Sequence, residues 1–328
     1  MAQASEKGPR CWVLSDGGAG MENQCLGLAA ALGLEPEVKR VRVRAPWRWL
    51  PAAFQPFALS SLSPAGDSLE PPWPDILIAC GKQVAAPAAA LRRASGGSCF
   101  TIYIQNPQRA LTGYDAVIAP MHDGLEGENV IETLGGLNRI TSERLEEARE
   151  AAPERLQTLE RPRVAVMIGG PSKSHRMTPE ILKPLIGVLL MATAVKGGSL
   201  MVTTSRRTGL ANQEALVEAL GGHAGDLYLG EGPNPYFDYL ALADLLVVTS
   251  DSVNMVSEAA ATGKPVYLLA LPGGTPKFNR FYEALIDSGR IRVFEGALES
   301  FHYVPLRETE RVAGLLKEIL VERGLIPK

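Results

Sequence analysis

Short apolar runs alternate with helix-like stretches along the first part of the chain. Runs that predict strands lie at residues 11–15, 37–43, 75–80, 99–105, 115–120 and 129–135. Between them, residues 22–33 and 83–94 are rich in alanine and leucine and predict helices. Wholly apolar strands that are separated by helices indicate a parallel sheet covered on both faces.

The alternation pauses at a charged stretch, residues 141–162, which predicts a helix followed by a linker between domains. Strands are then predicted at 163–170, 199–205, 226–230, 244–250, 264–271 and 291–296, and helices at 178–195, 209–221, 235–243, 253–263, 277–289 and 310–324. We therefore expect an α/β protein with two doubly wound, Rossmann-like domains facing a cleft. Their predicted bounds are 1–158 and 159–305, and a final helix in 306–328 is expected to pack back across the boundary.

Composition narrows the function classes. The 328 residues carry a net charge of −3 and only 6% aromatic residues, which argues against a nucleic-acid-binding protein. The first ten residues lack the apolar core of a signal peptide, and no apolar run is long enough to span a membrane. We expect a cytoplasmic protein.

Cysteine and histidine spacing gives no sign of a metal site. The four cysteines form no CxxC pair and lie in or beside apolar runs, which is typical of buried free thiols. The four histidines are far apart and form no HExxH motif. We expect no metal.

Ligands of doubly wound domains bind in the loops that follow the strands. The first such loop, SDGGAGMENQ, contains Gly17, Gly18 and Gly20, which allow a ligand to approach the backbone, and it places Glu22 at a helix start. A complete GxGxxG motif is absent, so a dinucleotide site is not favoured. The alternative is a glycine-rich turn with Glu22 as a helix cap.

Two further loops are suited to phosphate. Residues 168–178, IGGPSKSHRMT, combine two glycines with hydroxyl and basic side chains, although they do not form a P-loop. Residues 203–209, TTSRRTG, add Arg206 and Arg207, and arginine favours bidentate contact with phosphate oxygens. The alternatives are a solvated polar turn and a basic pair on the surface.

The fourth loop follows the apolar run at 244–250. In it Ser252, Met255 and Glu258 recur at three-residue spacing, so they share one face of the predicted helix. A glutamate early in an alanine-rich helix can accept hydrogen bonds from both hydroxyls of a ribose. The alternative is a surface glutamate.

The stretch ADLLVVTSDSVNMVSEAAATGKPVYLL resembles the nucleotide-sugar half of glycosyltransferases with the GT-B fold. In particular it is similar to the transferase that adds N-acetylglucosamine to the lipid precursor of peptidoglycan, with Ser257, Glu258, Gly263 and Pro265 in step. Across its length the chain also resembles the "elongated mitochondria" family of mitochondrial fission. That resemblance rests on SDGGAGMENQ, IQNP, IGGPSKSH and TSDSVNMVSEA.

The resemblance implies a metal-independent, inverting glycosyltransferase that uses a nucleoside diphosphate sugar, with a UDP-sugar favoured, and a lipid-linked acceptor. The sugar is then a substrate, and no cofactor is expected. Glu22 stands where the transferase has a histidine, and it is the first choice as catalytic base, with Asp16 second. The implied donor-site residues are Gly18, Gly170, Ser172, Lys173, Arg206, Ser252, Met255 and Glu258. The main chain of 229–231 is expected to contact the nucleotide base, and Asn279 and Arg280 are expected to contact the sugar. Asn106 is expected to lie in the cleft.

Residues 38–57 combine arginines with tryptophans and phenylalanines and contain no acidic residue. Cations beside interfacial aromatic residues favour an anionic membrane surface. This segment predicts a peripheral contact at the inner face of the membrane. The alternative is a strand and loop that pack on the first domain with the basic face solvated.

Two other functions fit the same sequence. A GT-B-like chain that has lost catalysis would be an adaptor at a membrane surface, as the fission label suggests. A nucleotide-sugar epimerase would need paired acid–base groups around the sugar, and the first loop offers two carboxylates. Both enzymes would have to bind a nucleotide, whereas the adaptor would not, so a binding measurement distinguishes them.

Overall fold

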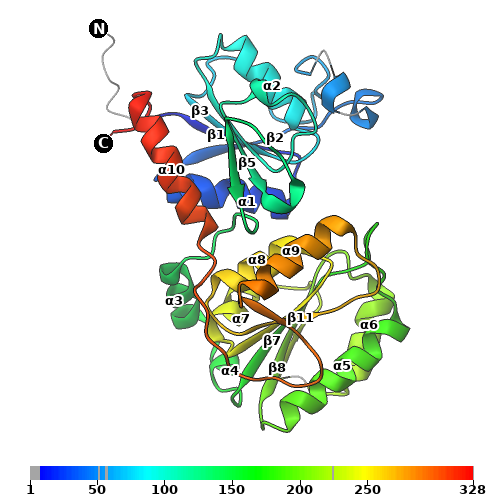
Figure 1. Ribbon diagram of the computed structural model, residues 1–328. Helices are drawn as coiled ribbons and strands as arrows, with labels where there is room; N and C mark the ends of the chain where they lie inside the picture. Colours follow the sequence, from blue (N-terminus) through cyan, green and yellow to red (C-terminus); the bar gives the residue numbers. More distant parts are fainter. Residues whose placement is uncertain (1–7, 51, 56–57, 224, 328) are drawn as a thin grey trace. The chain divides into compact units, whose positions relative to one another are not determined.

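The computed structural model describes residues 8–50, 52–55, 58–223 and 225–327 and divides the chain into two compact units (Figure 1). Unit 1 comprises Met1–Arg139 together with Arg307–Lys328, and unit 2 comprises Ile140–Leu306. Most of the amino-terminal stretch that lacks a signal-peptide core lies outside the described residues, as do Pro51, Pro56 and Phe57 of the expected membrane segment.

Unit 1 contains a parallel sheet in the order β2-β1-β3-β4-β5-β6. Its strands are β1 (Cys11–Ser15), β2 (Pro36–Arg40), β3 (Ile76–Cys80), β4 (Phe100–Ile104), β5 (Ala116–Pro120) and β6 (Val130–Thr133). Its helices are α1 (Ala19–Ala31), α2 (Ala85–Ala94) and α10 (Glu308–Glu322), with short 3-10 turns η1 (Trp47–Trp49), η2 (Ala52–Phe54), η3 (Leu111–Gly113) and η4 (Met121–Asp123).

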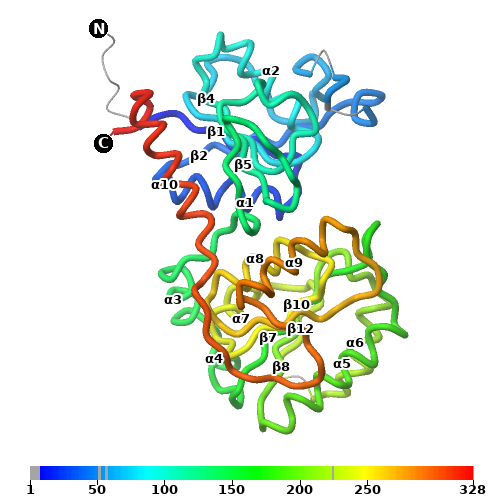
Figure 2. Tube along the Cα trace, in the orientation of Figure 1, coloured from blue at the N-terminus to red at the C-terminus, as the bar shows by residue number. Residues whose placement is uncertain are grey.

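Alternation along the strands explains how this sheet is covered. Val13 packs in a core with α1 and α10, whereas the next residue, Leu14, packs in a separate core with α2. Both residues are fully buried, as the apolar run predicts. The final helix therefore belongs to unit 1, where it lies beside α1 (Figure 2).

Unit 2 contains a second parallel sheet in the order β9-β8-β7-β10-β11-β12. Its strands are β7 (Arg163–Ile168), β8 (Ser199–Thr204), β9 (Asp226–Tyr228), β10 (Leu245–Thr249), β11 (Val266–Leu269) and β12 (Ile291–Val293). Its helices are α3 (Ser142–Ala151), α4 (Glu154–Gln157), α5 (Pro179–Ala194), α6 (Leu210–Leu220), α7 (Tyr236–Leu242), α8 (Val253–Ala261) and α9 (Pro276–Asp287). Helices α5 and α6 cover one face, and α7, α8 and α9 lie on the other (Figure 1).

The two doubly wound α/β sheets confirm the predicted fold, but the division between the units differs from the predicted boundary at 158. It falls after Arg139, because the charged helix α3 packs on α7 of unit 2. The guanidinium of Arg144 lies 4.1 Å from the ring centroid of Phe237, and Arg149 donates a hydrogen bond to the carbonyl of Ala241 at 3.3 Å. The stretch expected to be a linker is thus part of the second unit.

In the part of the chain that the structure describes, no helix combines the length and apolarity needed to cross a bilayer. Within the same residues, no group of three or more metal-ligating side chains is gathered at one point. The four cysteines are buried and free.

Candidate functional site

The strand order of unit 2 locates its candidate site. The chain proceeds from β7 outward through β8 and β9, and then returns to the other side of β7 through β10, β11 and β12. Ligands of such sheets bind where the order reverses, beyond the carboxyl ends of the strands. The reversal lies between β7 and β10, so the loop at Gly169 and the turn at Ser250–Ser252 meet there.

Asp251 connects the loops at this reversal point. Its side chain is fully buried, and its Oδ2 accepts hydrogen bonds from the Gly170 amide at 3.0 Å and from Arg207 at 2.6 Å. Its Oδ1 accepts from the Thr249 hydroxyl at 2.7 Å, and that hydroxyl oxygen accepts from the Gly169 amide at 2.8 Å. The loops after β7, β8 and β10 are therefore held together by one carboxylate.

The close approach of these loops explains both glycines. A Cβ atom on Gly169 would overlap the Asp251 carboxylate, and one on Gly170 would overlap the carbonyl of Arg207. The Gly170 amide donates to Asp251, so it is already engaged, whereas the sequence-based hypothesis assigned it to a diphosphate. Of the two neighbouring arginines, Arg207 makes the ordered ion pair, and the predicted Arg206 is exposed.

The remaining residues of the predicted phosphate loop turn back on themselves. The Ser172 hydroxyl accepts hydrogen bonds from the amides of Ser174 and His175, while Lys173 is exposed. His175 is buried, and its ring meets Phe278 edge-on at 4.9 Å between centroids. Burial lowers the pKa of His175, the charge of Asp251 opposes this shift, and Arg207 reinforces it. We therefore expect a neutral imidazole at pH 7.

Helix α8 begins at the same reversal point. Ser252 caps it by accepting a hydrogen bond from the Met255 amide at 3.3 Å, so both predicted residues lie in its first turn. Glu258 follows one turn later, partly buried, and accepts a hydrogen bond from the Tyr236 hydroxyl. Burial raises the pKa of Glu258 to about 7, and the hydrogen bond from Tyr236 opposes the shift.

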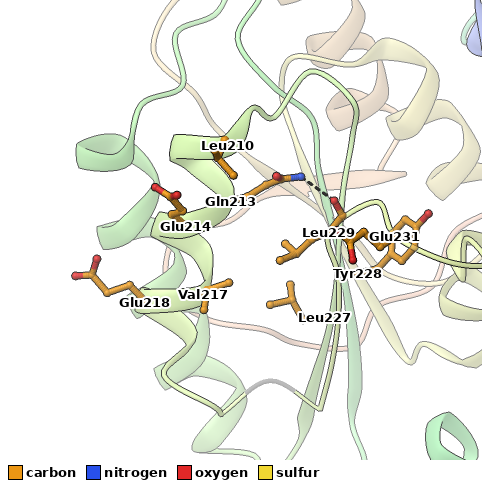
Figure 3. A pocket seen from close by; sticks show the side chains of 9 residues that line it. All are labelled: Leu210, Gln213, Glu214, Val217, Glu218, Leu227, Tyr228, Leu229 and Glu231. Atoms are coloured by element: carbon orange, nitrogen blue, oxygen red, sulfur yellow. Dashed lines mark hydrogen bonds between the residues drawn. The ribbon is translucent and has the colours of Figure 1, made fainter.

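The segment expected to meet a nucleotide base borders a groove between α6 and the edge strand β9 (Figure 3). The groove has a volume of about 610 Å³ and is lined by Leu210, Gln213, Glu214, Val217, Glu218, Leu227, Tyr228, Leu229 and Glu231. The Gln213 side chain donates to the carbonyl of Leu229 at 2.8 Å. That carbonyl is thus already engaged, although it was among the main-chain groups expected at the base.

The two predicted sugar-reading residues lie at the start of α9. Thr275 caps this helix through the Phe278 amide, and both Asn279 and Arg280 are exposed in its first turns. The loop before α9 is joined to the phosphate loop, because the Gly274 amide donates to the carbonyl of Ser174 at 2.6 Å. Asn279 is therefore in a segment tied to the reversal point of the sheet.

Unit 1 has a reversal point of its own, between β1 and β3. Asp16 follows β1, and its Oδ1 accepts a hydrogen bond from the Gly18 amide at 3.2 Å, where Gly18 is the N-cap of α1. The carboxylate of Asp16 also lies beside Gly81 at the end of β3. The two predicted residues Asp16 and Gly18 are thus at the position where this fold binds ligands.

Glu22 lies in the first turn of α1, as predicted, but it is not a free carboxylate. Arg40, at the end of β2, donates two hydrogen bonds to it, at 2.7 and 3.0 Å, and the Glu22 side chain is 15% exposed. These bonds lower the pKa of Glu22. Brønsted behaviour makes a carboxylate of low pKa a weaker general base.

Asn106 follows β4 in a constrained loop. Its side-chain oxygen accepts a hydrogen bond from the Gln108 amide at 2.8 Å. Both Gln105 and Gln108 have positive φ angles, of 81° and 52°, which residues other than glycine rarely adopt. Such backbone conformations cluster at functional sites. Asn106 therefore remains a candidate ligand-binding residue of unit 1.

A sequence model of the family described as Mitochondrial fission ELM1 matches residues 19–320. The chain belongs to the ELM1 family. This confirms the resemblance to the "elongated mitochondria" family. The "Mitochondrial fission protein ELM1" of Arabidopsis thaliana is 30% identical, over 96% of this chain and 92% of that protein.

Solved structures that are similar to this ELM1-family chain have the GT-B fold. A UDP-GlcNAc 2-epimerase from Methanocaldococcus jannaschii has a TM-score of 0.55 at 12% identity and covers 94% of this chain and 99% of its own. MurG from Acinetobacter baumannii has a TM-score of 0.50 at 15% identity, with 96% and 93% covered. These likenesses confirm the predicted fold class.

Several residues of the candidate site were not among the predicted ones. Asp251 and Tyr236 order the second unit, and Arg40 orders Glu22 in the first. Arg207 was predicted as a phosphate contact, whereas in the structure it pairs with Asp251. One signal was present for Asp251, since it is an acidic residue in the turn that follows the buried strand β10. The pairings themselves depend on strand order, which sequence reasoning did not supply.

Proposed function

We propose that this chain binds a nucleoside diphosphate sugar, preferably a UDP-sugar, at the carboxyl edge of the second sheet. The observation that carries the proposal is the arrangement around Asp251, which holds three loops and the start of α8 at one reversal point. An N-terminus of a helix attracts phosphate, and Arg206 and Lys173 are exposed cations in the adjoining loops. The M. jannaschii epimerase structure contains UDP-GlcNAc and UDP, which supports the choice of base.

Each predicted donor residue of unit 2 has a role in this proposal, whereas Gly18 lies in unit 1 and is given none. Glu258 accepts hydrogen bonds from the ribose hydroxyls, beside Ser252 and Met255 of the same helix. Ser172, Lys173 and Arg206 contact the diphosphate, the main chain of 229–231 meets the base, and Asn279 and Arg280 read the sugar. The Gly170 amide acts indirectly, by fixing the loop through Asp251.

The reaction that we propose is metal-independent, inverting transfer of the sugar to a hydroxyl of a lipid-linked acceptor. Cations and helix amides stabilise the leaving diphosphate. Unit 1 supplies the general base, and the bidentate contact of Arg40 with Glu22 makes Asp16 the better choice for that role. Glu22 and Asn106 are then assigned to binding the acceptor.

A second function is favoured by a specific observation. Both Glu22 and Glu258 already accept hydrogen bonds from protein side chains, Arg40 and Tyr236 respectively. A chain whose polar groups satisfy one another in this way can be a non-catalytic adaptor, and the family description concerns mitochondrial fission. The adaptor needs no nucleotide.

Calorimetric titration with UDP, GDP, ADP and their sugar conjugates tests the proposal. We expect micromolar binding of one nucleotide, weakened about tenfold to hundredfold in Glu258→Gln, because a charged hydrogen-bond acceptor is lost. The matched control is Glu318→Gln, which changes an exposed glutamate on α10 of unit 1, outside the groove between α6 and β9, and should leave binding unchanged. Failure of every nucleotide to bind would leave the adaptor as the better account.

The raised pKa of Glu258 predicts a pH dependence of binding. The ionised carboxylate accepts ribose hydroxyls best, and it takes up a proton as the pH falls through about 7. The affinity for a UDP-sugar should therefore be constant above pH 8 and decrease up to tenfold per unit below 7. Glu258→Gln should bind more weakly with a flat profile over the same range. An unchanged slope in that variant would assign the titration to another group.

A further inference from the structure

A group of exposed apolar side chains lies in unit 1 on the connection from β2 to β3. The side chains of Trp49 and Phe54 are 69% and 68% exposed, and Leu50 is 37% exposed. All three lie between residues 47 and 54, the stretch that contains η1 and η2. Single exposed apolar residues are ordinary, but a cluster of large ones indicates an interaction surface.

The same stretch carries a concentrated positive charge. Arg42, Arg44 and Arg48 are exposed, and the sequence has no acidic residue from 38 to 66, although the net charge of the chain is −3. The guanidinium of Arg48 lies 5.0 Å from the ring centroid of Trp49. Among the described residues, no carboxylate pairs with the side chain of Arg42 or Arg48. The charge is thus available to a partner.

These exposed side chains stand on an ordered support. Gln55 is buried, and its side-chain nitrogen donates to the carbonyls of Trp47 and Leu50 at 3.0 and 3.1 Å. The Arg44 amide donates to the carbonyl of Ser61 at 2.9 Å, and the Arg44 guanidinium contacts the carbonyl of Ser60. The surface is therefore preorganised to present aromatic and basic groups together.

We propose that this arginine–aromatic surface, formed by Arg42, Arg44, Arg48, Trp49, Leu50 and Phe54, docks the chain on an anionic lipid bilayer. Tryptophan and arginine are suited to the interface, where their apolar parts enter the acyl boundary and their polar parts remain hydrated. Anionic lipids complement the exposed arginines. The proposal does not rest on nucleotide binding, since the surface lies outside both reversal points.

Vesicle sedimentation tests the apolar part of the surface. The full chain should bind vesicles that mix phosphatidylcholine with phosphatidylglycerol, and bind phosphatidylcholine alone much more weakly. Trp49→Ser combined with Phe54→Ser should lower the partition coefficient at least about tenfold, since each side chain removes a large apolar area from the interface. The matched control is Met191→Ser with Val195→Ser, which changes two side chains of unit 2 that are 70% and 87% exposed.

Charge reversal tests the basic part. Each basic residue near an anionic surface contributes about 1 kcal/mol, or about fivefold in partition, so Arg42→Glu with Arg48→Glu should abolish binding. Lys196→Glu with Lys317→Glu makes the same change in net charge at two other exposed positions, and this pair should lower vesicle binding much less. Equal losses of vesicle binding in the two double variants would show an effect of net charge alone and would overturn the proposal. A wild-type chain that binds no anionic vesicle would overturn it as well. Calorimetry with UDP on the same variants separates this result from the proposed function, because nucleotide affinity should be unchanged.

Discussion

Asp251→Asn is expected to destabilise the second unit by about 2–4 kcal/mol and to remove nucleotide binding. The Asp251 side chain is fully buried and accepts hydrogen bonds from Gly170, Arg207 and Thr249. An asparagine amide would place a donor against these donors, and removing one member of a buried pair leaves its partners unsatisfied. The loss of unfolding free energy stays below that for a wholly buried ion pair, because the Arg207 side chain is 46% exposed and can be hydrated.

Urea denaturation followed by circular dichroism measures the change in unfolding free energy. The control is Asp287→Asn, at an exposed position at the end of α9, which should shift stability by less than about 0.5 kcal/mol. Arg207→Gln should also lower stability, because the buried Asp251 carboxylate loses its cation and keeps only the hydrogen bonds from Gly170 and Thr249. A loss below about 1 kcal/mol for Asp251→Asn would show that the three loops are held by packing rather than by this carboxylate.

Much of the fold could be predicted because the central strands of both sheets are short, largely apolar runs. The buried strand β1, which is apolar up to Ser15, and the small-residue helix α1 are examples, and both follow from the pattern alone. The domain boundary does not follow from the apolar pattern, because α3 is attached to unit 2 through arginine side chains. The contacts of Arg144 with Phe237 and of Arg149 with the α7 carboxyl end leave no apolar signature in the sequence.

The candidate site was predictable only as a set of loops. Strand ends indicated the loops after β1, β7, β8 and β10, and glycines indicated close approach. The partners within the loops depend on which strands are neighbours: Asp251 meets Arg207 because β7 lies between β8 and β10. Likewise Arg40 reaches Glu22 because β2 pairs with β1 in parallel register. Sequence spacing does not encode these distances.

Gly170→Ala is expected to be the second severe change, with a loss of about 3 kcal/mol in unfolding free energy. A Cβ atom at this position would overlap the carbonyl of Arg207, which is main chain and cannot rotate away. Either the loop after β8 moves or the Gly170 amide leaves Asp251, and overpacking of this kind costs about 1–3 kcal/mol or more. Gly187→Ala is the matched control. Gly187 lies in α5, where a Cβ atom would meet no other atom within 4 Å, so alanine should stabilise by about 0.5–1 kcal/mol.

Gly170→Ala also separates the structural role of the loop from its role in binding. If the reversal point binds a nucleoside diphosphate, a displaced Arg207 loop should lower the affinity at least about tenfold at a temperature where the variant is still folded. Calorimetry with the nucleotide that binds the wild type measures this, with Gly187→Ala again as control. A variant that is destabilised yet binds with unchanged affinity would move the phosphate site away from the loops joined by Asp251. In that case the start of α9, with Asn279 and the adjoining Gly274 loop, would be the next segment to test.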